Sequence, residues 1–382
     1  MRRTLFLAIC ALTALLAVAG AASPRSPSVC VLSWSVVPGA AVPGGELHSV
    51  AAAGPHDAWA VGGPSNWGMT TPRPTALTEH WDGAQWIVVP SPAVAGVLEG
   101  VAIAAHDDVW AVGELGRFGW RAGSGAPSRA FAEHWDGSAW TQVAVPGMER
   151  LSGVAASGRD VWAVGSTGGE AFVLRWSGSH WTPAVRRTHA ELFGVVAVSA
   201  NDVWAVGDET GRRFLELHWD GKRWSSYSQR PPKGWYDPEL LAVAAVGHDA
   251  VWAVGDSPGA DGSLYANTIV LRWNGSRWRS VSPLATYLWV DGLGVRPPGT
   301  LWLAGLGGDV DGYIQAGEGP VLERLSGGRW QTVVLDAGDR IDGFGDDRAG
   351  GLWAVGFTGS GIDENNGFPV QTTPLIERAR CS

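Results

Sequence analysis

The sequence of 382 residues contains very little lysine and cysteine, and it has no long hydrophobic run beyond its first 25 residues. Lys222 and Lys233 are its only lysines, and the excess of acidic residues gives a net charge of −9. An acidic surface argues against nucleic acid or anionic lipid as the partner. Without a second apolar run, no membrane anchor is expected either.

Motifs of common catalytic and cofactor sites are also missing. The sequence has no Gly-x-Ser-x-Gly, no zinc-spaced set of histidines and cysteines, and no phosphate-binding loop. Beyond residue 25, no stretch repeats its apolar residues with the 3.6-residue period of a helix. We therefore expect a chain of short strands that holds no cofactor and no metal.

The N-terminus has the pattern of a secretory signal peptide. Arg2 and Arg3 precede an apolar core over residues 5–18, and small residues at 19–21 offer a cleavage site. Residues 1–22 are therefore predicted to be removed, which changes the net charge from −9 to −11. The mature protein is expected to be secreted, extracellular and monomeric.

Tryptophan and glycine, in contrast, are abundant, with 23 and 54 residues. One phrase, cleanest as Asn-Asp-Val-Trp-Ala-Val-Gly at 201–207, recurs seven times at intervals of 42 to 52 residues. Its alternation of apolar and small residues predicts a short buried strand. A fixed period near 50 residues indicates a repeat architecture. The phrase is centred on Trp59, Trp110, Trp162, Trp204, Trp252, Trp302 and Trp353.

Each repeat contains four apolar segments, and an Asp-Gly or similar turn joins the third to the fourth. Asp-Gly between alternating apolar runs is a strong signal for a β-hairpin. Four antiparallel strands repeated radially describe an all-β, seven-bladed β-propeller, which we expect as a single domain over residues 30–381. The predicted blades are 46–90, 97–146, 150–185, 191–228, 239–283, 289–335, and 339–380 together with 30–38.

The last repeat stops without a fourth strand, and the mature N-terminus supplies a match for it. Residues 31–38 resemble the fourth strand at 86–90, so the N-terminal strand is predicted to complete the last blade and close the ring. Cys30 and Cys381 would then lie at adjacent strand ends, and Cys10 leaves with the signal peptide. Two cysteines in an exported chain favour a disulfide bond.

Nineteen of the tryptophans occupy repeated strand positions and are expected to fill the core between blades. The other four fall in the 2–3 and 4–1 connections, which join the second strand of a blade to its third and the fourth to the next blade. These connections lie on one face, where aromatic and polar side chains could bind a ligand. The candidate binding residues are Trp67, Trp120, Arg121, Trp235, Tyr236, Tyr265, Trp289 and Tyr313.

Two further groups of residues are weighed and set aside. Histidines recur at equivalent positions of different blades, which indicates a repeated structural role such as a hydrogen bond that closes a turn; they are His80, His134 and His218 before the hairpin turn, and His56, His106 and His248 in the 1–2 turn. The segment 309–312 resembles the opening of a calcium loop, with Glu318 as a further ligand, but the rest of that pattern is absent. Whether calcium binds at 309–318 stays open.

The combination of Trp-Ala-Val-Gly with a later His-Trp-Asp-Gly-x-x-Trp resembles the Trp-rich repeats of secreted actinobacterial β-propeller proteins. It is more distantly similar to Asp-box (BNR) repeats, whose hairpin also carries Asp, Gly and a following Trp. The Ser/Thr before the Asp and the Thr before the Trp are missing here, which argues against sialidase chemistry.

The leading functional hypothesis is a non-catalytic protein that binds a glycan, a cell-wall component or a protein through the face with the 2–3 and 4–1 connections. The alternative is an extracellular glycoside hydrolase or lyase with its site at the channel mouth, and a third hypothesis is a purely structural surface protein. An enzyme predicts acidic and basic groups that converge in the channel with shifted pKa values. A binding protein predicts exposed aromatic residues on the rim and an unremarkable channel.

Overall fold

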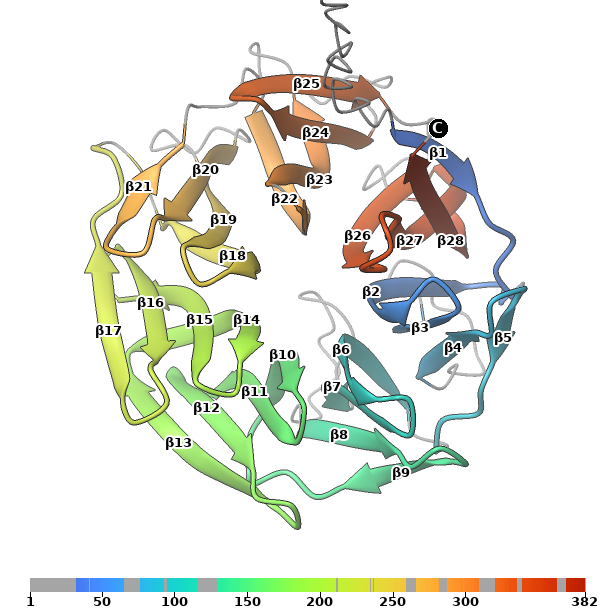
Figure 1. Ribbon diagram of the computed structural model, residues 1–382, viewed down its shortest axis with the longest axis horizontal. Coiled ribbons are helices and arrows are strands. Elements are labelled where there is room, and N and C mark those ends of the chain that lie inside the picture. Colours follow the sequence, from blue (N-terminus) through green and yellow to red (C-terminus); the bar gives the residue numbers. More distant parts are fainter. Residues whose placement is uncertain are drawn as a thin grey trace, which may run out of the picture.

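The computed structural model describes the following residues: 32–40, 42–64, 76–92, 95–115, 129–210, 212–233, 235, 237–258, 266–281, 287–297, 299–308, 320–334, 339–362 and 369–381. Within these ranges, no helix has the length and apolar character needed to span a bilayer. The described residues form seven four-stranded antiparallel sheets that surround a central axis (Figure 1). The predicted seven-bladed β-propeller is confirmed.

The strands are named by their place in each blade, counted from the axis outward. The first strands are β2 (Gly45–Gly54), β6 (Gly96–Ala105), β10 (Arg150–Ser157), β14 (Ala190–Ser199), β18 (Glu239–Gly247), β22 (Tyr287–Arg296) and β26 (Asp339–Asp346). The second strands are β3 (Asp57–Pro64), β7 (Asp108–Leu115), β11 (Asp160–Thr167), β15 (Asp202–Glu209), β19 (Ala250–Pro258), β23 (Thr300–Gly308) and β27 (Leu352–Ile362).

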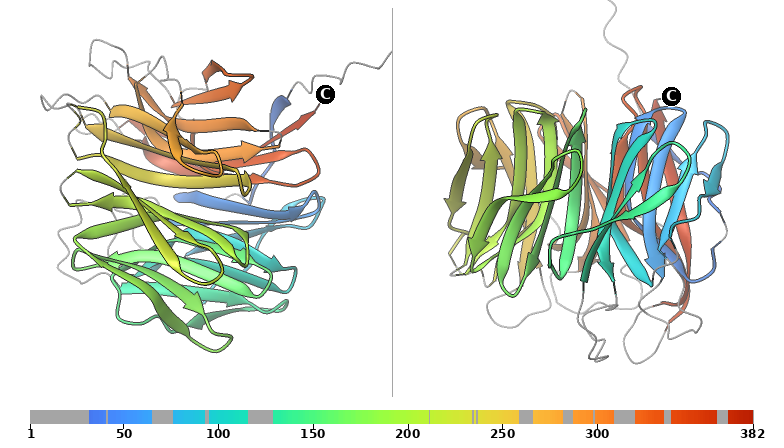
Figure 2. Two further views of the ribbon diagram at one scale, coloured as in Figure 1. Left: turned by 60° about the vertical axis from the view of Figure 1, so that its left-hand side comes forward. Right: turned by 90° about the horizontal axis from the view of Figure 1, so that it is seen from below.

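The third strands are β4 (Leu77–Trp81), β8 (Arg129–Trp135), β12 (Glu170–Trp176), β16 (Arg213–Trp219), β20 (Ala266–Trp273), β24 (Pro320–Ser326) and β28 (Pro369–Cys381). The fourth strands are β5 (Trp86–Val88), β9 (Trp140–Val143), β13 (Trp181–Thr188), β17 (Trp224–Gln229), β21 (Trp278–Ser280), β25 (Arg329–Val334) and β1 (Leu32–Val36). Seen edge-on, the blades stand side by side around the axis (Figure 2).

The N-terminal strand closes the ring, as predicted. β1 pairs antiparallel with β28, the last strand of the chain, and Trp34 lies opposite Ala379 (Figure 1). The ring of Trp34 also packs edge-on against Trp302 of the sixth blade, with ring centres 5.4 Å apart. The pairing ends at Leu32 and Cys381. Cys30 lies outside the described residues, so the Cys30–Cys381 disulfide stays a prediction.

The tryptophan of the repeated phrase fills the gap between neighbouring blades. Trp204 is fully buried, and its ring lies edge-on against Trp278 of the next blade at 5.2 Å between ring centres. It also packs against Trp273 at 4.9 Å. Such offset and edge-to-face contacts add to the area that each large ring buries. The core is therefore a series of layers between adjacent sheets.

A histidine or arginine covers each phrase tryptophan from the third strand. The ring of His218 stacks on Trp204 at 4.1 Å, and its Nε2 lies 2.9 Å from Asp202 Oδ1 at the start of the second strand. His248 of the next blade contacts the other oxygen of Asp202 at 2.7 Å. His80, Asp57 and His106 repeat this arrangement in the first two blades. The expected structural role is seen, but not as the closing of a hairpin turn: His80, His134 and His218 contact the aspartate that begins the second strand of their own blade. His106 and His248 contact that aspartate from the next blade.

Candidate functional site

One residue of every first strand is bulged out of its pairing with the second strand. In β14, for example, the pairing passes from Leu192 directly to Gly194 and skips Phe193. A bulge inserts one unpaired residue and re-aims its side chain. The seven skipped residues are His48, Glu99, Ser152, Phe193, Leu241, Asp291 and Asp342.

The glycine of the repeated phrase makes room for this bulge. A Cβ atom added to Gly207 would lie 1.9 Å from the carbonyl oxygen of Glu191, two residues before the bulged Phe193. No side-chain movement relieves an overlap with backbone. The equivalent distance is between 1.8 and 2.0 Å in all seven blades, at Gly62, Gly113, Gly165, Gly207, Gly255, Gly305 and Gly356.

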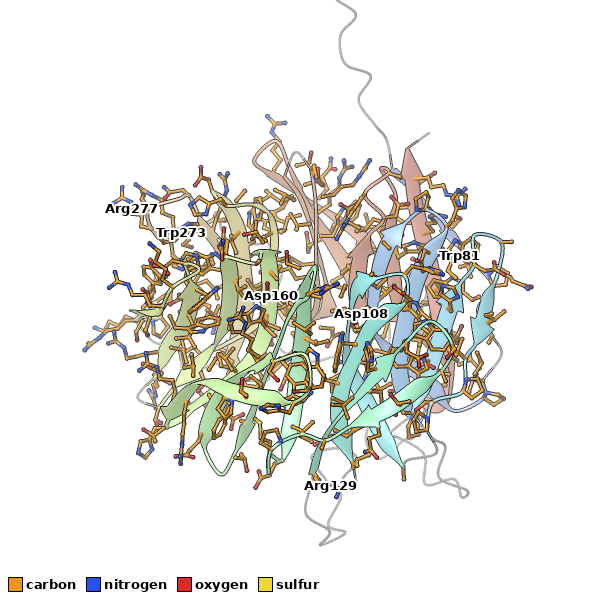
Figure 3. The ribbon with its side chains drawn as sticks, turned by 60° about the horizontal axis from the view of Figure 1, so that its bottom comes forward. Trp81, Asp108, Arg129, Asp160, Trp273 and Arg277 are labelled. Atoms are coloured by element: carbon orange, nitrogen blue, oxygen red, sulfur yellow. The ribbon has the colours of Figure 1, made fainter. Side chains whose placement is uncertain are left out.

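All seven bulged side chains line one cavity of about 430 Å³ at the mouth of the central channel. Glu46, Arg150 and Arg340, at the beginnings of β2, β10 and β26, line it as well. The cavity therefore opens on the face where the first strands begin, which carries the 2–3 and 4–1 connections. In Figure 3, the label on Arg129, at the start of a third strand, marks this face. The label on Arg277, in a 3–4 turn, marks the opposite face.

On one side of the cavity, His48 lies between two glutamates. Its Nε2 is 3.7 Å from Glu46 Oε2, and its Nδ1 is 3.4 Å from Glu99 Oε2 of the next blade. Burial alone would lower the pKa of His48, but the contacts with Glu46 and Glu99 raise it well above the usual 6.5. Burial would likewise raise the pKa of Glu99, but His48 and Arg150 lower it below 4.5. The two glutamates therefore favour the protonated form of His48.

On the other side, Arg340 bridges two bulged aspartates. Its Nη2 donates a hydrogen bond to Asp291 of the preceding blade, and its Nε donates one to Asp342 Oδ1 at 3.1 Å. Burial raises the pKa of Asp291 to about 6, against the opposing effect of Arg340, and it also raises the pKa of Asp342. The guanidinium lies 5.9 Å from the ring centre of Phe357.

Two carboxylate oxygens of this cavity have no hydrogen-bond donor. They are Glu46 Oε1 and Asp291 Oδ2, and both atoms are shielded from water. Glu46 is only 3% exposed, and the Asp291 side chain only 10%. A buried carboxylate oxygen without a donor is costly, so this pair marks a place where a partner is missing.

Further acids lie beside the cavity, on the fourth and fifth blades. A second cavity of about 430 Å³ is lined by Glu191, Asp208 and Asp237. Burial and the neighbouring charges of Glu239 and Glu191 raise the pKa of Asp208 to about 7. Within the described part of the chain, no group of three or more His, Cys, Asp or Glu residues could hold a metal ion.

The residues predicted to bind a ligand are only partly described. Trp235 is half-buried, and its ring packs edge-on against Phe214 at 6.4 Å, beside the core of the fourth and fifth blades. Trp289 lies in β22 opposite Leu306 and is also half-buried. Trp67, Trp120, Arg121, Tyr236, Tyr265, Tyr313 and the loop 309–318 lie outside the described residues.

The sequence does carry a signal for the channel residues, which the analysis of loops misses. In most repeats the bulged position follows a leucine, valine or isoleucine and precedes a small residue. Charged residues at this position, such as Glu99 and Asp342, interrupt otherwise apolar strands. An alignment of the first strands alone would have marked them as candidates.

Comparisons with known proteins identify the fold and no family. No protein-family model matches the sequence, and a search of curated proteins finds no match. A structure of YCF48 bound to D1 peptide is 14% identical, with 94% of this chain and 100% of that one covered and a TM-score of 0.55. YCF48 from Cyanidioschyzon merolae is 12% identical, over 91% and 98% of the two chains, with a TM-score of 0.55. The β-propeller domain of Myceliophteria thermophila Cps50 (Swd1) is 9% identical, over 91% and 99%, with a TM-score of 0.52. At these identities, the chain is similar to these proteins in its β-propeller fold.

Proposed function

We propose that this is a non-catalytic binding protein whose ligand enters the mouth of the central channel. The observation that carries the proposal is the convergence of seven bulged side chains, one from each blade, on one cavity of about 430 Å³. The volume of the cavity is typical of ligand sites, and its lining combines seven charged residues with apolar ones such as Phe193 and Leu241. The ligand classes are a glycan, a cell-wall component or a protein; a similar fold bound to a peptide supports the last of these.

The channel charges converge with shifted pKa values, as expected of an enzyme, but they are held in ion pairs, and this pairing supports a binding site. His48 is held by Glu46 and Glu99, and Arg340 by Asp291 and Asp342. Groups fixed in this way form a rigid polar surface that a ligand can recognise. The surrounding 2–3 and 4–1 connections, including the predicted aromatic residues, would extend the contact.

A second candidate function is a glycoside hydrolase or lyase at the same mouth. It is favoured by one observation, the raised pKa of Asp291, to about 6, beside a second carboxyl group on Asp342. Glycosidases use a protonated acid together with a second carboxylate. Release of reducing sugar or of an unsaturated product from a glycan that the protein binds would establish this function instead.

A glycan and cell-wall-fragment array tests the binding proposal. We expect Ser152→Phe to reduce binding by about tenfold or more, because it fills the cavity with a side chain that the fourth blade already carries there as Phe193. Arg277→Ala, on the opposite face, is the matched control and should bind like wild type. The variants Trp67→Ala, Trp120→Ala and Trp235→Ala measure how much the aromatic residues of the 2–3 and 4–1 connections contribute to the affinity.

Three results would overturn parts of this proposal. Absence of binding by the wild type rules out the glycan and cell-wall ligands. Binding that survives Ser152→Phe but is lost in Arg277→Ala moves the site to the other face. Unchanged binding in all three tryptophan variants would show that these aromatic residues are not part of the binding site.

The chain is further proposed to be exported and closed by the Cys30–Cys381 disulfide. The N-terminal pattern and the resemblance to secreted Trp-rich and Asp-box propellers support this. Protein recovered from the culture medium should lack the first 22 or so residues. Its non-reducing peptide map should contain a peptide that joins Cys30 to Cys381. Free thiols at both residues would contradict the disulfide.

A further inference from the structure

The charges that line the channel cavity do not balance. Four carboxylates line it, those of Glu46, Glu99, Asp291 and Asp342. Three cations line it, those of His48, Arg150 and Arg340. With all seven groups ionised, the cavity has an excess of one negative charge. Acids therefore outnumber bases in the lining of the cavity, which favours a positively charged ligand over a negative one.

The two unpartnered oxygens show where a hydrogen-bonding group is missing. Glu46 and Asp291 both line the cavity, and each has one carboxylate oxygen without a donor. An ionised carboxylate can only accept hydrogen bonds. The missing group must therefore be a donor, and the acidic lining of the cavity favours a positive one. Glu46 and Asp291 flank the seventh blade on its two sides, and Arg340 of that blade interacts electrostatically with both.

The surroundings of the cavity would draw a cation toward it. Glu191 and Glu239 begin the first strands of the fourth and fifth blades, and Asp256 lies at the end of β19. Asp256 is 6% exposed and accepts a hydrogen bond from the backbone of Val290, inside the cavity wall. Acids gathered at a cleft raise the local concentration of positive ligands.

The kind of cation follows from the size and spacing of the cavity groups. The described residues contain no cluster that could coordinate a metal ion. Arg340 already supplies a planar guanidinium to Asp291 and Asp342. A primary ammonium group is compact and carries three donors. Apolar walls at Phe193, Leu241 and Phe357 would pack against the carbon atoms that carry it.

From these observations we infer that the channel mouth binds a ligand through a primary ammonium group, which Glu46 and Asp291 accept. The inference rests on the proposed binding function and specifies its ligand chemistry. An amino sugar and a lysine side chain are two sources of the same group. In either case the amine must be free, because an N-acetyl group removes both the charge and two of the three donors.

Calorimetric titration with paired probes tests the inference. Glucosamine is compared with N-acetylglucosamine, and lysine methyl ester blocked at its α-amine is compared with its Nε-acetyl form, all at one ionic strength. We expect each free amine to bind at least about tenfold more tightly than its acetylated partner. The tighter of the two amines identifies the source as a sugar or as a peptide.

Two isosteric variants assign the effect to the channel. Asp291→Asn and Glu46→Gln should each weaken binding of the better amine by about tenfold or more. Asp82→Asn, in a 3–4 turn on the opposite face, should leave it unchanged. A thermal-shift measurement accompanies each titration: the amine should raise the melting temperature of wild type and of Asp82→Asn, and it should raise that of the channel variants less.

The inference fails if acetylated probes bind as tightly as free amines, or if both channel variants bind amines like wild type. This failure is separable from failure of the proposed function. If an array ligand is lost in Ser152→Phe but its binding does not depend on an amine, the binding site stands and the ammonium inference falls. If neither array ligands nor amines bind, both fall.

Discussion

Gly207→Ala is expected to lower the free energy of unfolding by about 3 kcal/mol or more. The added Cβ would lie 1.9 Å from the carbonyl oxygen of Glu191 and 2.9 Å from the Cα of Leu192. Both are backbone atoms of the neighbouring strand, so the overlap can be relieved only by loss of the bulge at Phe193. Urea unfolding followed by tryptophan fluorescence measures the change.

Gly247→Ala is the matched control. Gly247 lies at the end of the neighbouring β18, and a Cβ added there meets no atom within 4 Å. Its unfolding free energy should stay within about 1 kcal/mol of wild type, since alanine in an open strand position costs little. Equal effects of the two substitutions would show that the phrase glycine does not accommodate a bulge.

The folded protein is expected to be several kcal/mol less stable at about pH 8 than at about pH 5. Three buried glutamates of the third strands contribute to this loss, together with Asp208, Asp256 and Asp291, whose pKa values burial also raises. Burial raises the pKa of Glu79 and of Glu133 from 4.5 to about 7, and that of Glu216 to about 8. Each accepts a hydrogen bond from a neighbouring group, from Ala40 N, Ser91 Oγ and Gln229 Nε2 respectively.

The direction of this change in stability follows from the pH at which the folded and the unfolded chain each lose the proton. The unfolded chain ionises these groups near pH 4.5, whereas the folded chain holds their protons until pH 7 to 8. Stability is therefore full below pH 4.5, falls as pH rises through this window, and is constant above it. A rise of 2.5 pKa units corresponds to on the order of 3 kcal/mol for each of Glu79 and Glu133. The raised pKa values of His106 and His248 act in the same direction.

Replacing all three glutamates with glutamine isolates their contribution. Glutamine keeps an acceptor oxygen and removes the charge, so the triple variant should be more stable than wild type at pH 8 and nearly equal to it at pH 5. Urea unfolding at the two pH values measures both. If wild-type stability is flat or rises between pH 5 and 8, these glutamates are not neutral in the folded protein.

The sequence alone predicts the fold because its signals are local and repeated. The Asp-Gly turns and the phrase tryptophans mark strands within each blade, and the match of residues 31–38 to a fourth strand predicts how the ring closes. Pairing of Trp34 with Ala379 confirms that closure. Each of these features depends on residues close together in one repeat, or on a comparison of one repeat with another.

The channel site could not be predicted in the same way. A bulge is a shift of register between two strands. The apolar pattern of β14 or β6 alone does not show where the shift falls, and only an alignment of all the first strands does. The repeated phrase predicts a buried strand but does not show that its glycine lies against the backbone of Glu191. Attention to the loops also hid Asp291 and Asp342, because both belong to strands and meet only when the ring closes.

The contacts between blades were equally inaccessible to the sequence. His106 was grouped with the other 1–2 turn histidines, which is correct for its position within a repeat. Its partner, however, is Asp57 of the preceding blade, 49 residues earlier. Nothing in a single repeat specifies that pairing, since it depends on the angle between adjacent sheets.

The most direct test of the convergence of bulged side chains is the titration of His48 by NMR, from about pH 5 to about pH 9. Its signals are identified by their absence in His48→Gln. Because Glu46 and the bulged Glu99 of the next blade contact its ring, the midpoint should lie well above 6.5 in wild type. Glu99→Gln should lower it. A midpoint near 6.5 that does not respond to Glu99→Gln would show that the bulged residues do not meet in the channel.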